Sequence, residues 1–151
     1  MKIVEMRSDE IEVVKKLFLE VFSAEPWNDK WKSDEESLRY IRELTQNQNS
    51  LSLMLIDDFG DIVAVSLGYV FSWWQGKDYF IKEFFVRRES QGKGLGSEFL
   101  GLMEDFLLTR EIESIWLLTE RTVPAYRFYL KNGFTEEEEL VFFQKSFRKS
   151  S

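Results

Sequence analysis

The stretch that decides the fold is EFFVRRESQGKGLGS, which runs from Glu83 to Ser97. It begins with a short apolar run, Phe84 to Val86, of the aromatic and β-branched residues that favour strands. Glycines alternate at positions 92, 94 and 96, and an amphipathic segment follows them. Glycine adopts backbone conformations that other residues avoid, and it lets the main chain approach a ligand closely. The stretch therefore predicts a strand, a glycine loop and a helix in direct succession.

This loop is suited to bind a phosphate. The first turn of a helix has N–H groups without partners, and the helix dipole places its positive end there. Arg88 and Lys93 add charge to the same loop. The spacing fits neither the P-loop nor the dinucleotide fingerprint, in which the third glycine comes one residue later. The alternative is an ordinary glycine-rich turn that caps a helix, and three spaced glycines at a strand–helix join argue against it.

Hydrophobic periodicity and capping residues predict the elements on either side of the loop. Helices are expected at 9–22, 34–46, 94–108 and 124–132, and strands at 2–6, 51–57, 62–74, 79–86, 115–119, 134–135 and 140–147. Antiparallel strands thus surround one strand–helix–strand unit. The prediction is an α/β (α+β) domain with a mixed, mostly antiparallel sheet flanked by about four helices.

The composition supports one compact domain. The chain has 151 residues, and its 14 Phe, 5 Trp and 5 Tyr supply enough apolar side chain for a core. No repeat, low-complexity tract or Pro/Ser-rich linker divides it, so a single domain over 1–151 is expected. The net charge of −7 argues against nucleic-acid binding and suits a cationic ligand. The alternative is that this charge only keeps a small protein soluble.

Two residue types are missing, and their absence limits the chemistry. The chain has neither Cys nor His, which excludes thiolate nucleophiles, Ser-His-Asp catalysis and His- or Cys-ligated zinc. We therefore expect no metal, and acid–base work must fall to Glu, Asp, Tyr, Lys or water. The N-terminus lacks a long apolar stretch, and no run of about 18 apolar residues occurs. No signal peptide and no membrane contact are expected, and cytoplasmic residence is the default.

Two motifs resemble those of one enzyme family. Gln91-x-x-Gly94-x-Gly96 is similar to the Q/R-x-x-G-x-G/A signature of the GNAT superfamily of N-acetyltransferases, and the preceding EFFV looks like the strand before that signature. Downstream, AYRFYLKNGF (Ala125 to Phe134) resembles the family's A-x-x-F-Y-x-x-x-G-F segment. Both motifs lie within residues 79–134, and the predicted strand order agrees with the GNAT fold. The resemblance implies a single acetyl-CoA-dependent N-acetyltransferase domain over residues 1–151.

The resemblance also implies how acetyl-CoA is held. In GNAT enzymes the signature loop binds the CoA pyrophosphate through main-chain amides, here those of Gln91, Gly92, Lys93, Gly94, Leu95, Gly96 and Ser97. The preceding strand pairs with the pantetheine arm, which maps onto the main chain of Phe84, Phe85 and Val86. That strand bulges and splays from its neighbour, and β-bulges beside active sites re-aim side chains.

Three further positions are assigned to CoA by the same resemblance. Thr122 stands where the family often has an Asn that contacts the pantetheine arm. Arg88 stands where many members have Pro, and it favours the 3′-phosphate of CoA. Tyr126 is assigned to the adenine side, with plain packing as the alternative.

The implied reaction is direct attack of a neutral amine on the thioester carbonyl. An alkyl amine has a pKa of about 10.4, so only roughly one molecule in a thousand is neutral near pH 7.4. Glu83 is the candidate general base, acting directly or through water, and Tyr129 is the candidate general acid for the CoA thiolate. A main-chain N–H near Phe85 or Val86 would polarise the carbonyl. The alternatives are that Glu83 faces solvent or pairs with a Lys, and that Tyr129 only packs.

The acceptor side is predicted in the segment that follows the first helix. Glu25, Trp27 and Trp31 combine a carboxylate with indole rings, which can hold an ammonium by charge and cation–π contact. The EPWN sequence looks like one in bacterial small-molecule acetyltransferases, including aminoglycoside acetyltransferases. Trp73 and Trp74 are further candidates for the pocket wall. The alternative is that Trp27 and Trp31, four residues apart, pack on the core.

These observations favour an enzyme that acetylates a primary amine of a small cationic molecule. A protein or peptide N-acetyltransferase is an alternative within the same fold, and a non-catalytic acyl-CoA-binding sensor is an alternative from another class. The presence of both Glu83 and Tyr129 disfavours the sensor. The apolar stretch Leu140 to Phe143 is consistent with a homodimer.

Overall fold

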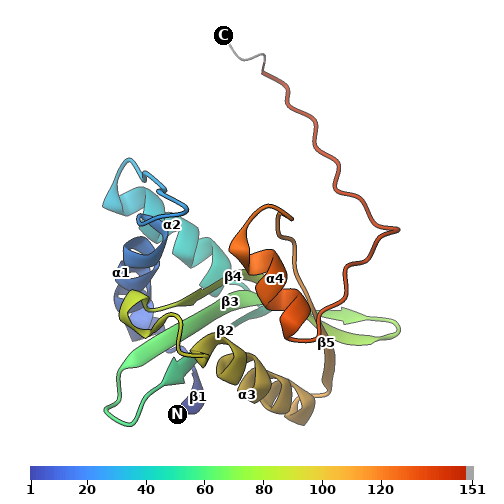
Figure 1. Ribbon diagram of the computed structural model, residues 1–151, viewed down its shortest axis with the longest axis horizontal. Helices are drawn as coiled ribbons and strands as arrows, with labels where there is room; N and C mark the ends of the chain where they lie inside the picture. The colour runs from blue at the N-terminus through green and yellow to red at the C-terminus, as the bar shows by residue number, and fades with distance from the viewer. Residues whose placement is uncertain (149–151) are drawn as a thin grey trace. The chain divides into compact units, whose positions relative to one another are not determined.

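The structure, a computed structural model, describes residues 1–148. The chain divides into two compact units, Met1–Leu118 and a second unit that begins at Thr119. The first unit contains β1 (Lys2–Glu5), α1 (Ile11–Phe22), α2 (Asp34–Thr45), β2 (Ser50–Ile56), β3 (Ile62–Trp73), β4 (Gly76–Val86), α3 (Leu95–Thr109) and β5 (Ile112–Trp116) (Figure 1). Short 3₁₀ helices, η1 (Ser8–Glu10) and η2 (Arg88–Ser90), precede α1 and α3, and the second unit contains α4 (Pro124–Lys131).

The sheet has five strands in the order β1-β2-β3-β4-β5. The first four pair antiparallel, whereas β4 and β5 pair in parallel because α3 connects them. This confirms the predicted mixed, mostly antiparallel sheet. The parallel pairing ends at Phe80 and Trp116, but β4 continues to Val86. Within residues 1–118, the second half of β4, residues 81–86, therefore has a strand partner on one side only.

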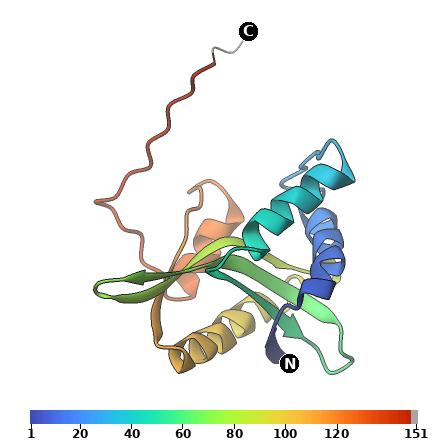
Figure 2. The same cartoon turned by 180° about the vertical axis from the view of Figure 1, so that it is seen from behind.

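Helices cover both faces of the sheet in the first unit. Figure 2 shows α1 and α2 on one face and α3 on the other. On the first face, buried Val14, Phe18 and Ile41 of the helices pack with Val65 and Phe85 of the strands. On the other face, buried Phe99 and Met103 of α3 meet the sheet. Burial of each such side chain stabilises the fold by roughly 1.5–3 kcal/mol, so both faces fix the position of β4.

A β-bulge interrupts the pairing of β3 with β4. Leu67 pairs with Glu83 but Gly68 pairs with Ile81, so Lys82 is an extra residue in β4. The backbone approach here is close, because a Cβ on Gly68 would lie 2.0 Å from the carbonyl oxygen of Phe80. Only glycine fits at this position, and the bulge turns the following residues of β4 to new directions.

Several element boundaries differ from the sequence prediction for local reasons. The helix expected from residue 9 begins at Ile11, because the main-chain N–H of Arg7 donates to Glu10 Oε1 (2.9 Å) and η1 precedes the helix. The strand expected at 115–119 lies at Ile112–Trp116. The helix expected from residue 34 does begin there, since the hydroxyl of Ser33 accepts from the N–H of Glu36 (3.2 Å) and caps α2.

The predicted final strands, 134–135 and 140–147, are wrong for the described residues. Up to residue 148, no residue after α4 lies in a helix or a strand. Leu140, Val141, Phe142 and Phe143 are all exposed. Their β-propensity is realised only where a neighbouring strand supplies hydrogen bonds and a packing surface. The second unit, as far as it is described, contains no such strand. None of the helices formed by residues 1–148 has the length and apolar content to cross a membrane.

Candidate active site

The glycine loop has the geometry of an anion cradle. Gly92 and Gly94 have φ values of +76° and +77°, which side-chain-bearing residues rarely adopt. Gly94 is the N-cap of α3, and its carbonyl accepts the N–H of Glu98 (3.1 Å). The helix therefore starts at Leu95, one residue later than predicted. The N–H groups of Leu95 and its two successors form the first turn, where an α-helix offers donors without intrahelical acceptors.

Side chains tie this loop to the end of β4. The Gln91 amide donates to the carbonyl oxygen of Val86 (2.9 Å), and Arg87 Nε donates to the hydroxyl of buried Ser90 (3.0 Å). The side chains of Arg88 and Lys93 are exposed. The anchored residues hold the loop in one conformation, while the exposed cations can approach a ligand phosphate.

The end of β4, beside the loop, extends beyond its pairing with β5. The rings of Phe80 and Trp116 are 4.3 Å apart where β4 and β5 still pair. Beyond this contact, the main chain of residues 81–86 has no partner on β5. The side chains of Phe84 and Phe85 are held on opposite faces, because Phe84 stacks on Phe99 of α3 (5.4 Å) and Phe85 meets Phe18 of α1 (5.7 Å). An extended ligand can pair with the edge of a strand through main-chain hydrogen bonds.

Glu83 is largely withdrawn from solvent and faces α2. Tyr40 of α2 donates a hydrogen bond to Glu83 Oε2 at 3.4 Å. Burial raises the pKa of Glu83 above its usual range, whereas the charge of Lys82 and the Tyr40 hydrogen bond lower that pKa and the charge of Asp29 raises it. Burial, followed by the Glu83 charge, also raises the pKa of Tyr40. The alternative of a solvent-facing Glu83 is therefore wrong, whereas the other alternative, a Lys partner, agrees with the charge of Lys82 acting on the carboxylate. A carboxylate whose pKa is raised suits a general base.

An aromatic cluster adjoins this carboxylate. The Trp31 ring lies 5.5 Å from Tyr40 and 6.0 Å from Phe18, and Trp27 lies 5.1 Å from Phe22. Both tryptophans thus pack on the aromatic core, as the alternative interpretation expected. Trp27 is still 40% exposed, and Trp31 is partly exposed, so each also presents a ring surface to solvent.

The remaining acceptor candidates are more exposed. Glu25 lies at the surface of the segment between α1 and α2. Trp73 and Trp74 are 64% and 80% exposed at the tip of the β3–β4 hairpin. Within residues 1–118, these two tryptophans join no aromatic contact of the cluster at Tyr40.

The second unit contains the other predicted residues. Tyr129 lies on α4, and its ring packs against Phe128 and Phe134, each 5.2 Å away. Tyr126 donates to Glu136 Oε2 (2.9 Å), and Glu136 also pairs with Arg121. Thr122 is exposed and is not the helix cap, because Val123 occupies the N-cap position before Pro124.

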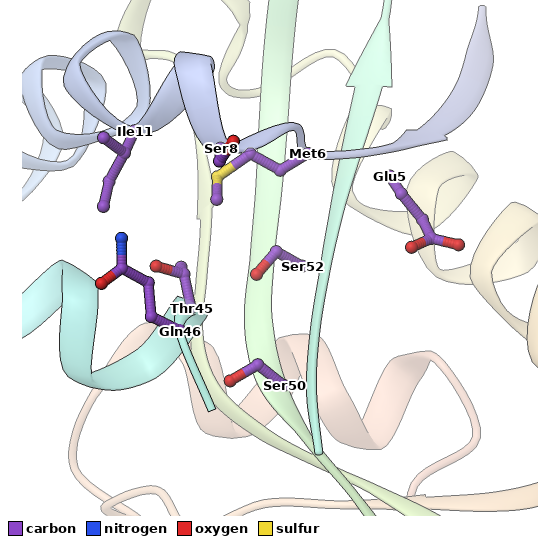
Figure 3. A pocket seen from close by; sticks show the side chains of 8 residues that line it. All are labelled: Glu5, Met6, Ser8, Ile11, Thr45, Gln46, Ser50 and Ser52. Carbon is purple, nitrogen blue, oxygen red and sulfur yellow. The ribbon is translucent and has the colours of Figure 1, made fainter. Parts of the chain in front are cut away.

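A small pocket lies elsewhere in the first unit (Figure 3). It has a volume of about 120 Å³, and its lining residues include Glu5, Ser8, Gln46 and Ser52. None of the predicted site residues lines it. A volume of this size holds a few water molecules rather than a drug-sized ligand.

Two comparisons place the chain among acetyltransferases. The sequence profile of the acetyltransferase (GNAT) family matches residues 11–134. The chain therefore belongs to the GNAT family of acetyltransferases. It is an acetyl-CoA-dependent acetyltransferase, as the members of this family are. No curated protein sequence matches the chain.

Solved structures share the fold at low sequence identity. A probable acetyltransferase is 13% identical with a TM-score of 0.78, over 99% of this chain and 100% of that one. An aminoglycoside acetyltransferase from an uncultured soil metagenomic sample, in complex with sisomicin, is 18% identical with a TM-score of 0.72, over 97% and 96%. AAC(6′)-Iy in complex with the bisubstrate analogue CoA-S-monomethyl-acetylneamine is 16% identical with a TM-score of 0.69, over 96% and 97%. At these sequence identities the comparison shows a shared fold and nothing finer.

Sequence reasoning missed three polar residues around Glu83: Tyr40, Lys82 and Asp29. Tyr40 shares the buried face of α2 with Ser37 and Leu44, so helical spacing could have placed it toward the sheet. Its pairing with a residue 43 positions later has no local signal. Lys82 reaches the Tyr40 ring because of the bulge, which sequence periodicity does not reveal.

Proposed function

We propose that this protein transfers the acetyl group of acetyl-CoA directly to a primary amine of a small cationic molecule, with Glu83 as the general base. The observation that supports this most is the place of Glu83. It is a shielded carboxylate on the part of β4 that extends beyond the pairing with β5, and it adjoins an aromatic cluster. We also propose that both units act as one acetyltransferase domain, since the family match runs through both.

The residues of the loop and strand fit acetyl-CoA. The first-turn amides after Gly94 suit a pyrophosphate, and the exposed Arg88 and Lys93 suit further phosphate charge. The main chain of residues 84–86, which β5 does not reach as a pairing strand, suits the amide groups of the pantetheine arm. Thr122 and Tyr126 are the proposed contacts from the second unit. When bound, the thioester supplies an activated acetyl group, so the protein needs no covalent nucleophile.

The chain's own groups handle the protons. Glu83 takes the proton of the attacking amine, directly or through a water molecule, because most of the amine is protonated at neutral pH. An N–H near Phe85 or Val86 stabilises the negative charge that develops on the acetyl oxygen. Tyr129 returns a proton to the thiolate, since a phenol pKa of about 10 is not far above that of a thiol.

Charge and aromatic surface support a cationic acceptor. Glu83 bonds to Tyr40, whose ring lies 5.5 Å from that of the partly exposed Trp31, and Asp29 precedes Trp31 by two residues. Trp27 and Glu25 extend this surface along the segment between α1 and α2. Aminoglycoside acetyltransferases are among the structures that share the fold, which is consistent with an acceptor of this class.

A screen for CoA release tests the proposed function. Acetyl-CoA is mixed with the protein and with polyamines, aminoglycosides, amino acids or lysine-containing peptides, and free thiol is measured. We expect turnover with polyamines or aminoglycosides and little with peptides. Turnover with peptides alone would contradict the proposal and would indicate a protein or peptide acetyltransferase instead. Binding of acetyl-CoA without turnover on any amine would favour a sensor.

The change Tyr129→Phe is expected to lower kcat by about a hundredfold while leaving the affinity for acetyl-CoA nearly unchanged, because only the donated proton is lost. The ring packing against Phe128 and Phe134 does not need the hydroxyl. Steady-state kinetics together with calorimetric titration of acetyl-CoA measure the two effects separately. Tyr69→Phe is the matched control, since it removes a phenol hydroxyl that donates to the carbonyl oxygen of Glu43 instead. Equal kcat in Tyr129→Phe and the unchanged protein would remove Tyr129 as the acid.

We further propose that the segment 140–147 mediates a homodimer. It exposes large apolar side chains, including Phe143 (88% exposed), and such a segment gains free energy by pairing with a second copy. Sedimentation should show a dimer for the full chain and a monomer for Phe143→Glu. Phe59→Glu is the matched control, since Phe59 is 90% exposed at the β2–β3 turn. A Phe143→Glu chain that still dimerises would place the interface elsewhere.

A further inference from the structure

We propose that Tyr40 of α2 and Lys82 of β4 are positioning residues that hold the Glu83 carboxylate in place and in its charged form. This inference rests on the proposed role of Glu83 as the general base. It adds a second layer of residues that determines when Glu83 can accept a proton.

The hydroxyl of Tyr40 is held by its surroundings. The Tyr40 ring lies 5.9 Å from Phe18 and 5.5 Å from Trp31, so it is fixed between two other aromatic rings. The start of α2 is fixed as well, because Lys15, which is itself buried, pairs with Asp34 at 2.6 Å. With the ring and the helix both fixed, the hydroxyl is directed to Glu83 Oε2 at 3.4 Å. The carboxylate thus has a defined donor on the α2 side.

The bulge in β4 brings a cation to the same side. In a regular strand, consecutive side chains point to opposite faces of the sheet. Here Lys82 Nζ lies 5.7 Å from the centroid of the Tyr40 ring, while Glu83 bonds to the hydroxyl of that ring. Both neighbours therefore reach α2, because Lys82 is the extra residue in the β3–β4 pairing. The positive charge contacts the ring face by a cation–π interaction and lies near the carboxylate.

Four influences set the charge state of Glu83, and they have different signs. Burial is the largest and disfavours the carboxylate, so it raises the pKa. Lys82 and the Tyr40 hydroxyl both favour the carboxylate and lower the pKa. Asp29, from the segment between α1 and α2, has the same charge as Glu83 and raises the pKa. Removing a partner must therefore move the Glu83 titration in a direction that depends on which partner is removed.

Carbon-13 NMR of the full protein, with labelled glutamate carboxyl groups, tests this inference without an acceptor. The Glu83 signal is assigned by its loss in Glu83→Gln, and its titration midpoint is followed with pH. We expect Tyr40→Phe and Lys82→Gln to move the midpoint to higher pH and Asp29→Asn to move it to lower pH. A shift of about half a pH unit corresponds to a roughly threefold change in the proton-binding constant. Tyr69→Phe is the matched control, because Tyr69 donates to the carbonyl oxygen of Glu43 instead.

Kinetics then link the charge state to the reaction. With the amine that gives the fastest CoA release, the acidic limb of the kcat/KM profile should follow the NMR midpoint in every variant. A merely structural role of Tyr40 would lower activity equally at all pH values. If Tyr40→Phe does not fold, the surface changes Lys82→Gln and Asp29→Asn still decide by the opposite signs of their shifts.

The outcomes separate this inference from the proposed function. Unchanged midpoints in Tyr40→Phe, Lys82→Gln and Asp29→Asn would overturn the inference, even if Glu83→Gln is inactive. Full activity of Glu83→Gln would overturn the proposed base, whatever the midpoints are. Shifted midpoints combined with acidic limbs that do not follow them would also overturn the inference, because the charge state would then not control the reaction.

Discussion

The change Glu83→Gln lowers kcat/KM at neutral pH by about a hundredfold to ten-thousandfold, the range that a positioned general base contributes. Gln retains the size of the side chain and an oxygen that accepts the Tyr40 hydroxyl, but it cannot take a proton. The affinity for acetyl-CoA should stay unchanged, because the proposed contacts of β4 with the pantetheine arm are made by its main chain. Initial rates of CoA release and calorimetric titration measure the two quantities.

The loss of kcat/KM in Glu83→Gln should become smaller as the pH rises. The neutral fraction of an alkyl amine rises with pH and reaches one half at its pKa of about 10.4, so at high pH the acceptor needs the base less. A plot of rate against pH should therefore show the variant approaching the unchanged protein near pH 9–10. A loss of equal size at all pH values would indicate a structural defect instead. Glu113→Gln, at an exposed position of β5, is the matched control and should keep full activity.

The change Glu83→Gln also has an expected effect on the stability of the folded protein. Folding raises the pKa of Glu83, so the folded state binds this proton more tightly than the unfolded chain does. The resulting stabilisation is fully present below the unfolded pKa and is lost as the pH rises through the folded pKa. At neutral pH the charged Glu83 carboxylate is shielded from water, which lowers the free energy of unfolding, and the neutral Gln side chain avoids this loss. We expect Glu83→Gln to have a Tm at pH 7 equal to or above that of the unchanged protein, although it is nearly inactive.

The parts of the site that the sequence predicts are local ones. The end of β4, the glycine loop and the first residues of α3 lie within fifteen consecutive positions, from Glu83 to Ser97, so their chemistry is visible in the spacing of a few residues. Hydrophobic periodicity likewise placed α1, α2 and α3 within one or two residues of their ends. Such features depend on short-range preferences that do not change with the rest of the fold.

The parts of the site that the sequence does not predict depend on contacts between strands and helices that are distant in the chain. The bulge at Lys82 exists because Gly68, on the neighbouring strand, lets the carbonyl of Phe80 approach closely. The contact of Tyr40 with Glu83 needs α2 to lie over the end of β4, which no local pattern states. The segment 140–147 differs, because its composition favours a strand but no strand forms there. The described residues of its own unit include no strand with which it could pair. Residues with a strand preference form a strand only where a neighbouring strand supplies hydrogen bonds and a packing surface.

The change Gly94→Trp should abolish the stabilisation that acetyl-CoA gives. At a hundred times Kd, a ligand stabilises a folded protein by about 2.7 kcal/mol, which for a chain of this length corresponds to a rise in Tm of roughly 5–10 °C. Gly94 has a φ of +77° at the N-cap of α3 and open space around it, so an indole there would project into the volume where we propose the pyrophosphate binds. Thermal unfolding with and without millimolar acetyl-CoA measures the rise.

Strain alone would also lower Tm, and Gly60→Trp separates the two effects. Gly60 has a φ of +85° and open space around it, but it lies in the turn between β2 and β3, away from the loop. Both variants bear the cost of a side chain in a left-handed conformation, about 1–2 kcal/mol, so both should unfold at lower temperature without ligand. Only Gly94→Trp should fail to respond to acetyl-CoA. An equal rise in both variants would mean that the amides after Gly94 do not bind the diphosphate, and the roles proposed for the loop would then have no support.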